Sequence, residues 1–308
     1  MNSNFIIQQL SNIKQVVIGI RPPLVTSLTH PQNRVYSDSL VAGLDSFLTA
    51  LVNHSSIQPI LHISSVAAIN HLQAQRMVSE ADDLRTASTD LVAPYDCFKR
   101  ACEEAIDTIA VMAKIPTTTL RLGAIFSDHE ACIQCQALQL QARVGCYLPT
   151  FIDCNSSRNV AAAIQLVLRE QQQQQQQHEN AGENHGPRYY YYTRPCSRPD
   201  PIPYGQYLQD YRSAHALVWA IWIPVWIVKY FVAAVHWVAA FTQAKNVPYL
   251  ESCDYLLQVS AQEHSFDCRK FAREFPDILN GEETFEECFR RRRRQLQISS
   301  TGNFDKKL

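Results

Sequence analysis

The chain has 308 residues, of which 46% are hydrophobic, and its 28 basic side chains stand against 29 acidic ones. This is long and apolar enough for one large domain or two small ones. A net charge of −1 argues against a nucleic-acid partner and against an acidic substrate. Residues 1–12 are polar and lack the apolar core of a secretory signal, so we expect the ten cysteines to be reduced thiols facing the cytosol.

The first predicted elements are a strand and a helix. The apolar run Gln15–Ile20 ends at Arg21 and two prolines, which predicts a buried strand that enters a loop. In the range Tyr36–Val52 apolar residues recur at helical spacing, which predicts a helix with Ser37 or Asp38 as its N-cap.

Two more strands are predicted around a second helix. Pro59–Ile63 predicts a buried strand that runs directly into two serines, and Thr117–Phe126 predicts a strand rich in β-branched residues. Between them, Pro94 occupies the favoured first turn of a helix that continues to about Ala113. Strands that alternate with helices of ten or more residues indicate a Rossmann-like α/β fold, a parallel sheet with helices on both faces.

Low-complexity sequence interrupts this alternation. The run Gln171–Gln177 lies in a polar insert, residues 169–188, for which we expect no regular structure. Tyr189–Tyr192 then predicts a short strand, and a proline-rich connection follows as far as residue 214.

The most hydrophobic segment is Ala216–Phe241, which contains all four tryptophans of the chain. It exceeds the roughly 20 residues that cross a bilayer as a helix, and indole rings prefer the headgroup region. Pro224, Lys229 and His236 interrupt it, and a buried helix of a soluble core is the alternative. We expect a membrane-associated helix at residues 215–242, which either spans the bilayer or lies in it as a re-entrant pair.

The last predicted unit, residues 243–308, is a helical tail. Within it Cys268–Glu287 is amphipathic, and Arg290–Arg294 has two interpretations, a solvated helix end or a contact with anionic lipid headgroups. The other units are a Rossmann-like catalytic domain at residues 1–168, the glutamine insert, a substrate region at residues 189–214 and the membrane helix.

Three side chains carry the chemistry that the sequence indicates. Ser65 follows a buried strand, and Tyr95 and Lys99 stand four residues apart on the next helix, hence on one face. Dehydrogenation of an alcohol requires a base, and a tyrosine, whose ordinary pKa is about 10, can serve when a nearby cation stabilises its phenolate. A serine at a strand end can hold the substrate oxygen, since such folds bind ligands at the carboxyl ends of parallel strands.

The order of these motifs resembles that of the extended short-chain dehydrogenases. The stretches that carry the resemblance are Leu61–Ser65, Ala93–Ala105 and Leu120–Phe126, together with Asn159–Ala163, which is similar to a motif of the 3β-hydroxysteroid dehydrogenases. The resemblance implies that Tyr95 is the general base, Lys99 its pKa-lowering and ribose-binding partner, and Ser65 the group that binds the substrate hydroxyl. It also implies NAD or NADP as the cofactor, held by Lys99, Tyr95, Leu122 and Gly123.

The chain also departs from the family pattern. Phe98 stands where a serine or threonine usually precedes the lysine, and Leu122 stands where a proline is usual. No G-x-G-x-x-G occurs, and the first two glycines, Gly19 and Gly43, lie far apart. Only about fourteen residues precede the first predicted strand, and one βαβ unit needs about 30. We therefore expect the first βαβ units of the nucleotide-binding fold to be missing.

Three functional hypotheses stay open. The first is NAD(P)-dependent oxidation of the 3β-hydroxyl of a steroid- or sterol-like lipid by an incomplete or weakly active copy. The second is a non-catalytic, membrane-anchored interaction protein that has lost cofactor binding. The third keeps the dehydrogenase family but takes a nucleotide sugar or a polyol as substrate. The resemblance also implies attachment to the membrane, in the endoplasmic reticulum, with the catalytic part in the cytosol, and it leaves a homodimer open.

A zinc site is the remaining alternative. His129, Cys132 and Cys135, with Cys146 and Cys154 further along, could be combined into one. A strong zinc motif needs a second close pair of ligands. Because this sequence does not provide one, we favour buried thiols and expect no metal.

Overall fold

The structure is a computed structural model of the chain. The residues that it describes are 15–20, 31–54, 59–69, 75–82, 94–128, 142, 146–147, 153–178, 186–198, 200–215, 223–224, 226–227, 230, 233–234, 237 and 264–302.

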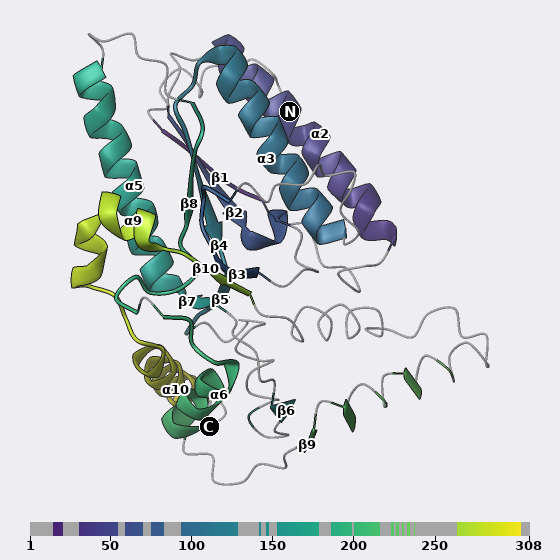
Figure 1. The fold of residues 1–308 in the computed structure, drawn as a ribbon, viewed down its shortest axis with the longest axis vertical. Helices are drawn as coiled ribbons and strands as arrows, with labels where there is room; N and C mark the ends of the chain where they lie inside the picture. Colours follow the sequence, from purple (N-terminus) through teal and green to yellow (C-terminus); the bar gives the residue numbers. More distant parts are fainter. Residues whose placement is uncertain are drawn as a thin grey trace.

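Four parallel strands form the central sheet, in the order β1-β2-β4-β8 (Figure 1). They are β1 (Val16–Gly19), β2 (Ile60–Ser65), β4 (Thr117–Leu122) and β8 (Arg188–Tyr191). The three strands predicted in the first half of the chain are present, and so is the tyrosine-rich strand. The prediction of an α/β fold with a parallel sheet is therefore confirmed.

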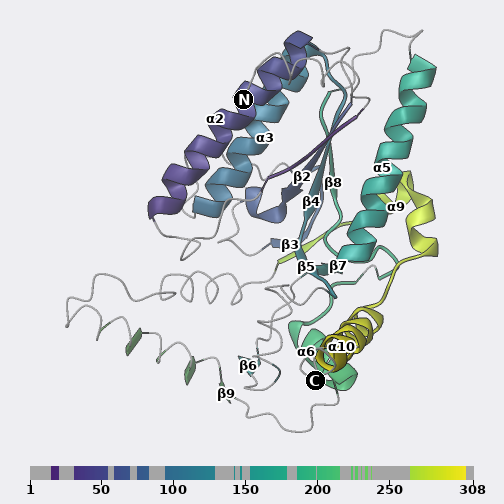
Figure 2. The same ribbon diagram turned by 180° about the vertical axis from the view of Figure 1, so that it is seen from behind.

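Helices cover both faces of this sheet (Figures 1 and 2). One face is covered by α2 (Pro31–His54) and α3 (Pro94–Ala113), and the other by α5 (Ser157–His178), α9 (Arg269–Glu274) and the 3-10 helix η3 (Pro276–Asn280). Ile60 packs with α2 and α3, whereas its neighbour Leu61 packs with α5 and α9. This alternation follows from the strand period of two and places a core on each side of the sheet.

Helix α2 begins earlier than the periodicity indicates. Its first residue is Pro31, so the prediction of an N-cap at Ser37 or Asp38 is wrong. Proline is favoured in the first helical turn, because its missing N–H has no intrahelical partner there. The predicted start of α3 at Pro94, which rests on the same rule, is confirmed.

The strand predicted over Thr117–Phe126 is divided at Gly123. β4 ends at Leu122 in the central sheet, and β5 (Ala124–Phe126) pairs with β7 (Cys154–Ser156) in a second sheet. A Cβ atom added to Gly123 would lie 2.5 Å from the main-chain oxygen of Asp153. Only glycine permits this approach, so Gly123 is the residue at which the chain can leave the central sheet and enter the second sheet.

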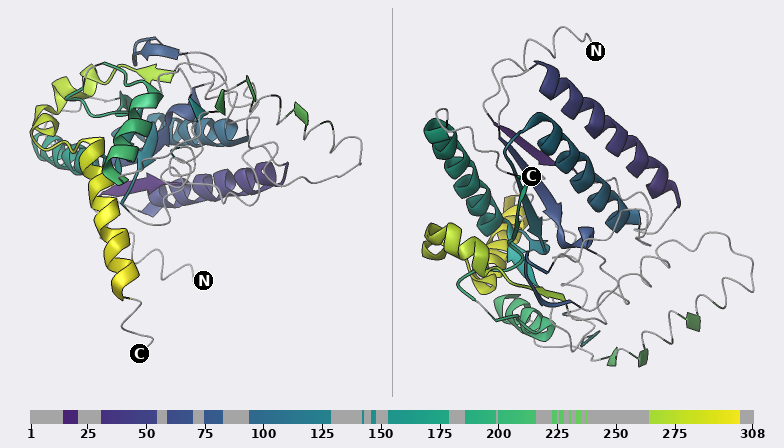
Figure 3. Two further views of the ribbon diagram at one scale, coloured as in Figure 1. Left: turned by 90° about the horizontal axis from the view of Figure 1, so that it is seen from below. Right: turned by 45° about the horizontal axis from the view of Figure 1, so that its top comes forward.

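A smaller lobe packs against the carboxyl end of the central sheet (Figure 1). It consists of α6 (Tyr204–His215) and α10 (Phe285–Gly302), which pack on β5 and β7 around Phe126, Tyr207 and Phe289. The C-terminal part of α10 projects from the body of the molecule (Figure 3). The remaining short elements are η1 (Val66–Ala68), the parallel pair β3 (Gln75–Val78) with β10 (His264–Phe266), and the parallel pair β6 (Cys146–Tyr147) with β9 (Ile223–Pro224).

The glutamine run is helical, so the prediction of no regular structure is wrong for residues 169–178. α5 continues through it to His178, because glutamine is a good helix former and the preceding turns already pack on the sheet. Gln171 is buried, and its Nε2 donates to the Ile60 carbonyl at 3.3 Å and to the Thr118 hydroxyl at 3.1 Å. Residues 179–185 of the insert lie outside the described residues.

The arginine run on α10 is largely engaged within the protein. Arg291 forms ion pairs with Asp128 and Glu283. Arg292 is buried and donates to the Ser127 carbonyl at 3.3 Å, and Arg293 donates to the carbonyl of Ala214 at 3.1 Å. The run therefore joins α10 to the end of β5 and to α6. The side chain of Arg290 is 58% exposed, and Arg294 is also exposed.

Of the apolar segment Ala216–Phe241, residues 223–224, 226–227, 230, 233–234 and 237 are described and the others lie outside the described residues. None of the helices in the described part of the chain has both the length and the apolar character needed to cross a membrane. The aromatic side chains of Trp226, Tyr230 and Trp237 are 61%, 72% and 69% exposed. The membrane helix stays a prediction.

Candidate active site

The three residues that the sequence indicates lie on elements that meet at the carboxyl end of the central sheet. β2 lies between β1 and β4, with Ile63 opposite Gly19 and Ser65 opposite Leu122. Helix α3 packs on β2 and on η1, which directly follows Ser65. The carboxyl ends of parallel strands are the usual place for ligands in such folds.

The two serines at the end of β2 have different partners. The Ser64 hydroxyl donates to Glu103 Oε1 at 2.7 Å and is buried beneath α3. Ser65 is half-buried and caps η1, since its Oγ accepts the N–H of Ala67 at 3.2 Å. Accepting this bond leaves the O–H of Ser65 as a donor. Ser65 is therefore the serine whose hydroxyl can bind a substrate oxygen.

Tyr95 and Lys99 occupy successive turns at the start of α3. Tyr95 is half-buried, whereas Lys99 is only 6% exposed. The Lys99 Nζ donates to the main-chain oxygen of Ile20 at 2.7 Å, just beyond the end of β1. An ammonium group has three N–H donors, so this bond does not exhaust its capacity. The contact brings the cation of α3 to the ends of β1 and β2.

Two titratable side chains near Lys99, those of His62 and Cys102, are held neutral at physiological pH. Burial, together with the charges of Lys99 and Arg121, lowers the pKa of His62 to about 4, although Glu103 opposes the shift. Burial raises the pKa of the Cys102 thiol to about 12. Glu103, one helical turn from Lys99, stays ionised and is paired with Arg121.

A buried ionic network beneath α3 is a feature that the sequence analysis missed. Arg121 donates through Nε and Nη2 to the two carboxylate oxygens of Glu103 at 2.9 and 2.7 Å, and through Nη1 to the Tyr191 hydroxyl at 3.2 Å. Burial alone would raise the pKa of Glu103, but the bonds from Arg121 and Ser64 outweigh it and lower that pKa. The Glu103 carboxylate thus joins α3 to β2 and β4, and Arg121 extends the network to β8.

Leu122 and Gly123, the other residues assigned to the cofactor, have structural roles on the described surfaces. The Leu122 side chain is 3% exposed and packs in the core under α5, on the sheet face opposite Lys99. Gly123 is required by the close approach of Asp153. Only the main chain of these two residues is therefore available to a ligand at the strand end.

A second buried ion pair lies where the central sheet meets the smaller lobe. Asp153 Oδ2 accepts bonds from Arg194 Nη1 at 2.7 Å, from the Thr193 hydroxyl at 2.8 Å and from the Phe266 N–H at 2.8 Å. Burial raises the pKa of Asp153, and these partners oppose the shift only in part. The pair fixes the segment that follows β8 against β7 and β10.

The described residues hold no cluster of three or more side chains that could bind a metal ion. Of the zinc candidates, His129, Cys132 and Cys135 lie outside the described residues, and Cys154 is buried in the core of the smaller lobe.

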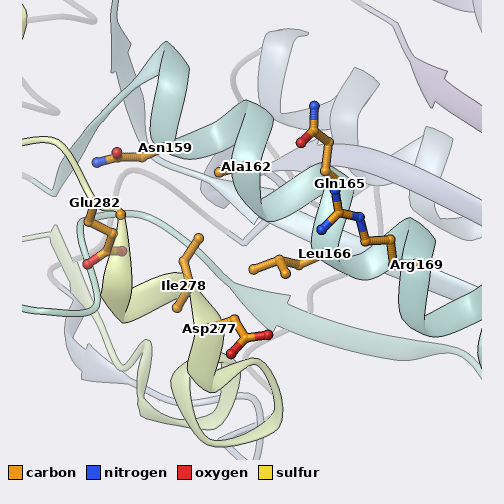
Figure 4. Close-up of a pocket in the computed structure, with 9 residues that line it drawn as sticks. Asn159, Ala162, Gln165, Leu166, Arg169, Asp277, Ile278 and Glu282 are labelled. Atoms are coloured by element: carbon orange, nitrogen blue, oxygen red, sulfur yellow. The ribbon is translucent and has the colours of Figure 1, made fainter.

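A cavity of ≈ 240 Å³ lies between α5 and η3, with Gln165 and Arg169 on one wall and Asp277 and Glu282 on the other (Figure 4). Because α5 covers the sheet face opposite α3, this cavity is separate from Tyr95 and Lys99.

Comparisons with known proteins identify the fold. A scan against protein-family models finds no match, and a search of curated proteins finds none. Solved structures do match. One is gox2253, with 13% identity, a TM-score of 0.68, and coverage of 97% of this chain and 82% of that one. Another is a short-chain dehydrogenase/reductase superfamily protein from Agrobacterium tumefaciens with bound NAD, with 12% identity, a TM-score of 0.61, and coverage of 97% and 85%.

A third similar structure is the UDP-N-acetylglucosamine 4-epimerase from Bacillus cereus, with 11% identity, a TM-score of 0.56, and coverage of 93% of this chain and 80% of that one. At these identities the likeness concerns the fold, which this chain shares with short-chain dehydrogenase/reductase and epimerase structures. The predicted fold class agrees with this result.

Proposed function

We propose that the chain is an NAD(P)-dependent oxidoreductase that acts on a secondary alcohol or the corresponding carbonyl. The observation that carries the proposal is the position of Tyr95 and Lys99 on successive turns of α3, with the Lys99 ammonium 2.7 Å from the Ile20 oxygen at the carboxyl end of the sheet. This is where a parallel α/β sheet offers space for a ligand, and it is where a proton must be moved.

Each of the three side chains has a defined role in this proposal. Ser65 donates its hydroxyl proton to the substrate oxygen and orients it toward Tyr95. The Tyr95 phenolate takes the proton of the alcohol in the oxidative direction, and the Tyr95 hydroxyl returns a proton in the reductive direction. Lys99 stabilises the phenolate, since a cation one helical turn away favours the charged form.

The residues present fit one end of a nicotinamide cofactor. Lys99 lies between the ends of β1 and β2, where its ammonium can bind ribose hydroxyls as well as the Ile20 carbonyl. The chemistry that a bound nicotinamide supplies is hydride exchange with the carbinol carbon. The sequence contains no G-x-G-x-x-G turn for the pyrophosphate, so we assign residues of this chain only to the ribose end.

The substrate class has two candidates. A nucleotide sugar is favoured by the structural likeness to the UDP-N-acetylglucosamine 4-epimerase. A steroid- or sterol-like 3β-hydroxy lipid is favoured by the run Asn159–Ala163 and by the apolar segment Ala216–Phe241. We place the nucleotide sugar first, because the apolar segment bears on where the protein resides and does not contribute to the described site.

We further propose that the protein is attached to a membrane, that of the endoplasmic reticulum, with Tyr95 and Lys99 on the cytosolic side. The exposed rings of Trp226, Tyr230 and Trp237 support this, since indoles and phenols favour the bilayer interface. Attachment predicts that the protein stays with the membrane pellet in high salt and is released only by detergent. Release into a salt wash would contradict it.

The test of the activity uses the full chain and the variant Tyr95→Phe, with Tyr230→Phe as a matched control because Tyr230 is an exposed tyrosine that does not belong to α3. Reduction of NAD and of NADP is followed with 3β-hydroxysteroids and with UDP- and dTDP-sugars. Loss of the base should reduce kcat by about 10²–10⁴-fold, whereas the control should retain full activity. Equal activity of both variants would remove Tyr95 from the mechanism.

A chain that neither turns over any substrate of this panel nor binds NAD or NADP would favour the non-catalytic, membrane-anchored alternative. Nicotinamide fluorescence and calorimetry with the unmodified chain measure that binding directly.

A further inference from the structure

Two cysteines lie together at the base of the smaller lobe, outside the candidate active site. Cys196 belongs to the turn that follows β8, in which the Arg198 N–H donates to the Pro195 carbonyl at 3.1 Å, and Cys268 directly precedes α9. The Cys196 Sγ lies 3.7 Å from the main-chain oxygen of Cys268, although the two residues are 72 positions apart. Cys196 is half-buried and Cys268 is 4% exposed.

The turn that carries Cys196 is held in place independently of its thiol. The Glu282 carboxylate accepts the N–H groups of Cys196 and Ser197, each at 2.7 Å, and the Tyr192 hydroxyl at 2.9 Å. On the other side, the Cys268 Sγ lies 3.4 Å from the Thr193 hydroxyl. The main chain at Cys196 and the sulfur of Cys268 are thus held side by side by contacts that do not involve a bond between the two sulfurs.

The two thiols also interact with each other. The interaction with Cys268, together with burial, raises the pKa of the Cys196 thiol, and the interaction with Cys196 lowers the pKa of the Cys268 thiol. Cys268 therefore provides thiolate character at a lower pH than an isolated cysteine. Burial instead raises the pKa values of the Cys102 and Cys154 thiols.

We propose that Cys196 and Cys268 are a reversible oxidation site that forms an intramolecular disulfide with a hydroperoxide as the oxidant. Attack of one sulfur on the peroxide bond gives a sulfenic acid and releases an alcohol, or water from hydrogen peroxide. The second sulfur then displaces water from the sulfenic acid. In total two thiols lose two electrons and two protons, and ROOH becomes ROH and H₂O.

The disulfide would close a loop that contains α6 and the whole apolar segment Ala216–Phe241. The cross-link would hold the two ends of this loop together, one end next to the end of β8 and the other at the start of α9. This inference is independent of the proposed catalytic activity, because neither cysteine contacts Ser65, Tyr95 or Lys99 through any bond that the structure describes.

The test treats the purified full chain with hydrogen peroxide, blocks the remaining thiols with N-ethylmaleimide after denaturation, and maps the unreduced peptides by mass spectrometry. We expect a linked Cys196–Cys268 pair that dithiothreitol reverses. The matched control Cys97→Ser removes another half-buried thiol and should retain the link. Cys196→Ser should abolish it and leave Cys268 labelled by the maleimide.

The proposal is overturned if both cysteines of the unmodified chain carry maleimide, or carry sulfinic acid, after oxidation. A second measurement needs no variant. Closing a loop of this length should raise the midpoint of thermal unfolding of the oxidised chain by roughly 5–10 °C. An identical midpoint with and without dithiothreitol would contradict the cross-link.

Discussion

The two faces of the central sheet are stabilised in different ways. On the α5 side, Leu120 and Leu122 of β4 lie in an apolar and aromatic core with Phe271 and Phe275. On the α3 side, the carboxyl half of the same strand contributes Arg121 to a network of charges and hydrogen bonds. Both faces are buried, as expected for a parallel sheet with helices on both sides.

This difference between the two faces indicates which side of the sheet can hold reactive polar side chains in fixed positions. A buried charge is tolerated only when it is fully paired, so the α3 face needs specific partners at specific positions. The α5 face is mostly apolar, so it depends chiefly on side-chain volume, and its buried polar contacts are neutral hydrogen bonds such as those of Gln171. The groups of the candidate site, Ser65, Tyr95 and Lys99, lie at the open end of the polar network, where buried side chains already occupy fixed positions. On the α5 face the described polar groups include Arg169, Asp277 and Glu282 around the cavity, and they are separate from these three side chains.

The largest expected change in the free energy of unfolding comes from the substitution Arg121→Met, which disrupts the ionic network on the α3 face. This variant leaves the Glu103 carboxylate buried without its main partner, so the free energy of unfolding should fall by about 3–5 kcal/mol in urea titrations. The double variant Glu103→Leu/Arg121→Met should recover much of the loss, because no unpaired charge remains. Arg290→Met is the control, since the Arg290–Glu286 pair is 58% and 44% exposed and should change stability by less than about 1 kcal/mol. Equal losses at the two arginines would contradict the comparison.

The next effect concerns pH and His62, which faces Lys99, Glu103 and Arg121. Its pKa falls from 6.5 in the unfolded chain to about 4 in the folded protein. The unfolded state therefore binds more protons between these values, and stability decreases as the pH falls from about 6.5 to about 4, by up to about 3 kcal/mol. His62→Gln should remove this slope. A variant whose unfolding free energy keeps the wild-type dependence on pH in this range would show that His62 is not its source.

The smallest effect tests the other face, at the glutamine run. Gln171→Ala removes two buried hydrogen bonds to β2 and β4, and it should lower the free energy of unfolding by about 1–2 kcal/mol. Gln173→Ala is the matched control, since Gln173 is an exposed residue of the same helix and should stay within about 0.5 kcal/mol. Denaturation curves of the two variants that coincide would show that the two hydrogen bonds of Gln171 do not stabilise the fold.

Much of the fold could be predicted from the sequence where the signal is local. The apolar strands and the Pro94 start of α3 follow from periodicity and from the rules for helix ends. The helical state of the glutamine run was not predicted, because the composition indicates a polar insert, while the packing of the preceding turns and the contacts of Gln171 and Gln172 with distant residues are set by the tertiary fold. The break between β4 and β5 depends on Asp153, which is distant in sequence and leaves no local pattern.

The candidate site shows the same division. Tyr95 and Lys99 could be found because residues four apart on a helix share a face. The network of Glu103 could not be found, because its partners come from three other elements and are joined only by the tertiary fold. The contact of Lys99 with Ile20 likewise spans 79 positions of sequence. Pairing of buried polar groups is determined by the packed structure and not by local composition.

Gly123 has a consequence for how sequences of this kind are compared. Its hydrogen atom points at two main-chain oxygens, those of Asp153 and Thr193, which a methyl group would approach to 2.5 and 3.1 Å. Every single-nucleotide change that alters a glycine codon to encode another residue introduces a side chain there. Any such side chain would force the junction between the two sheets to shift, so packing alone disfavours the change. A glycine that follows a strand of this fold can therefore be required by close main-chain packing between two sheets. A motif search would assign the same glycine to cofactor recognition.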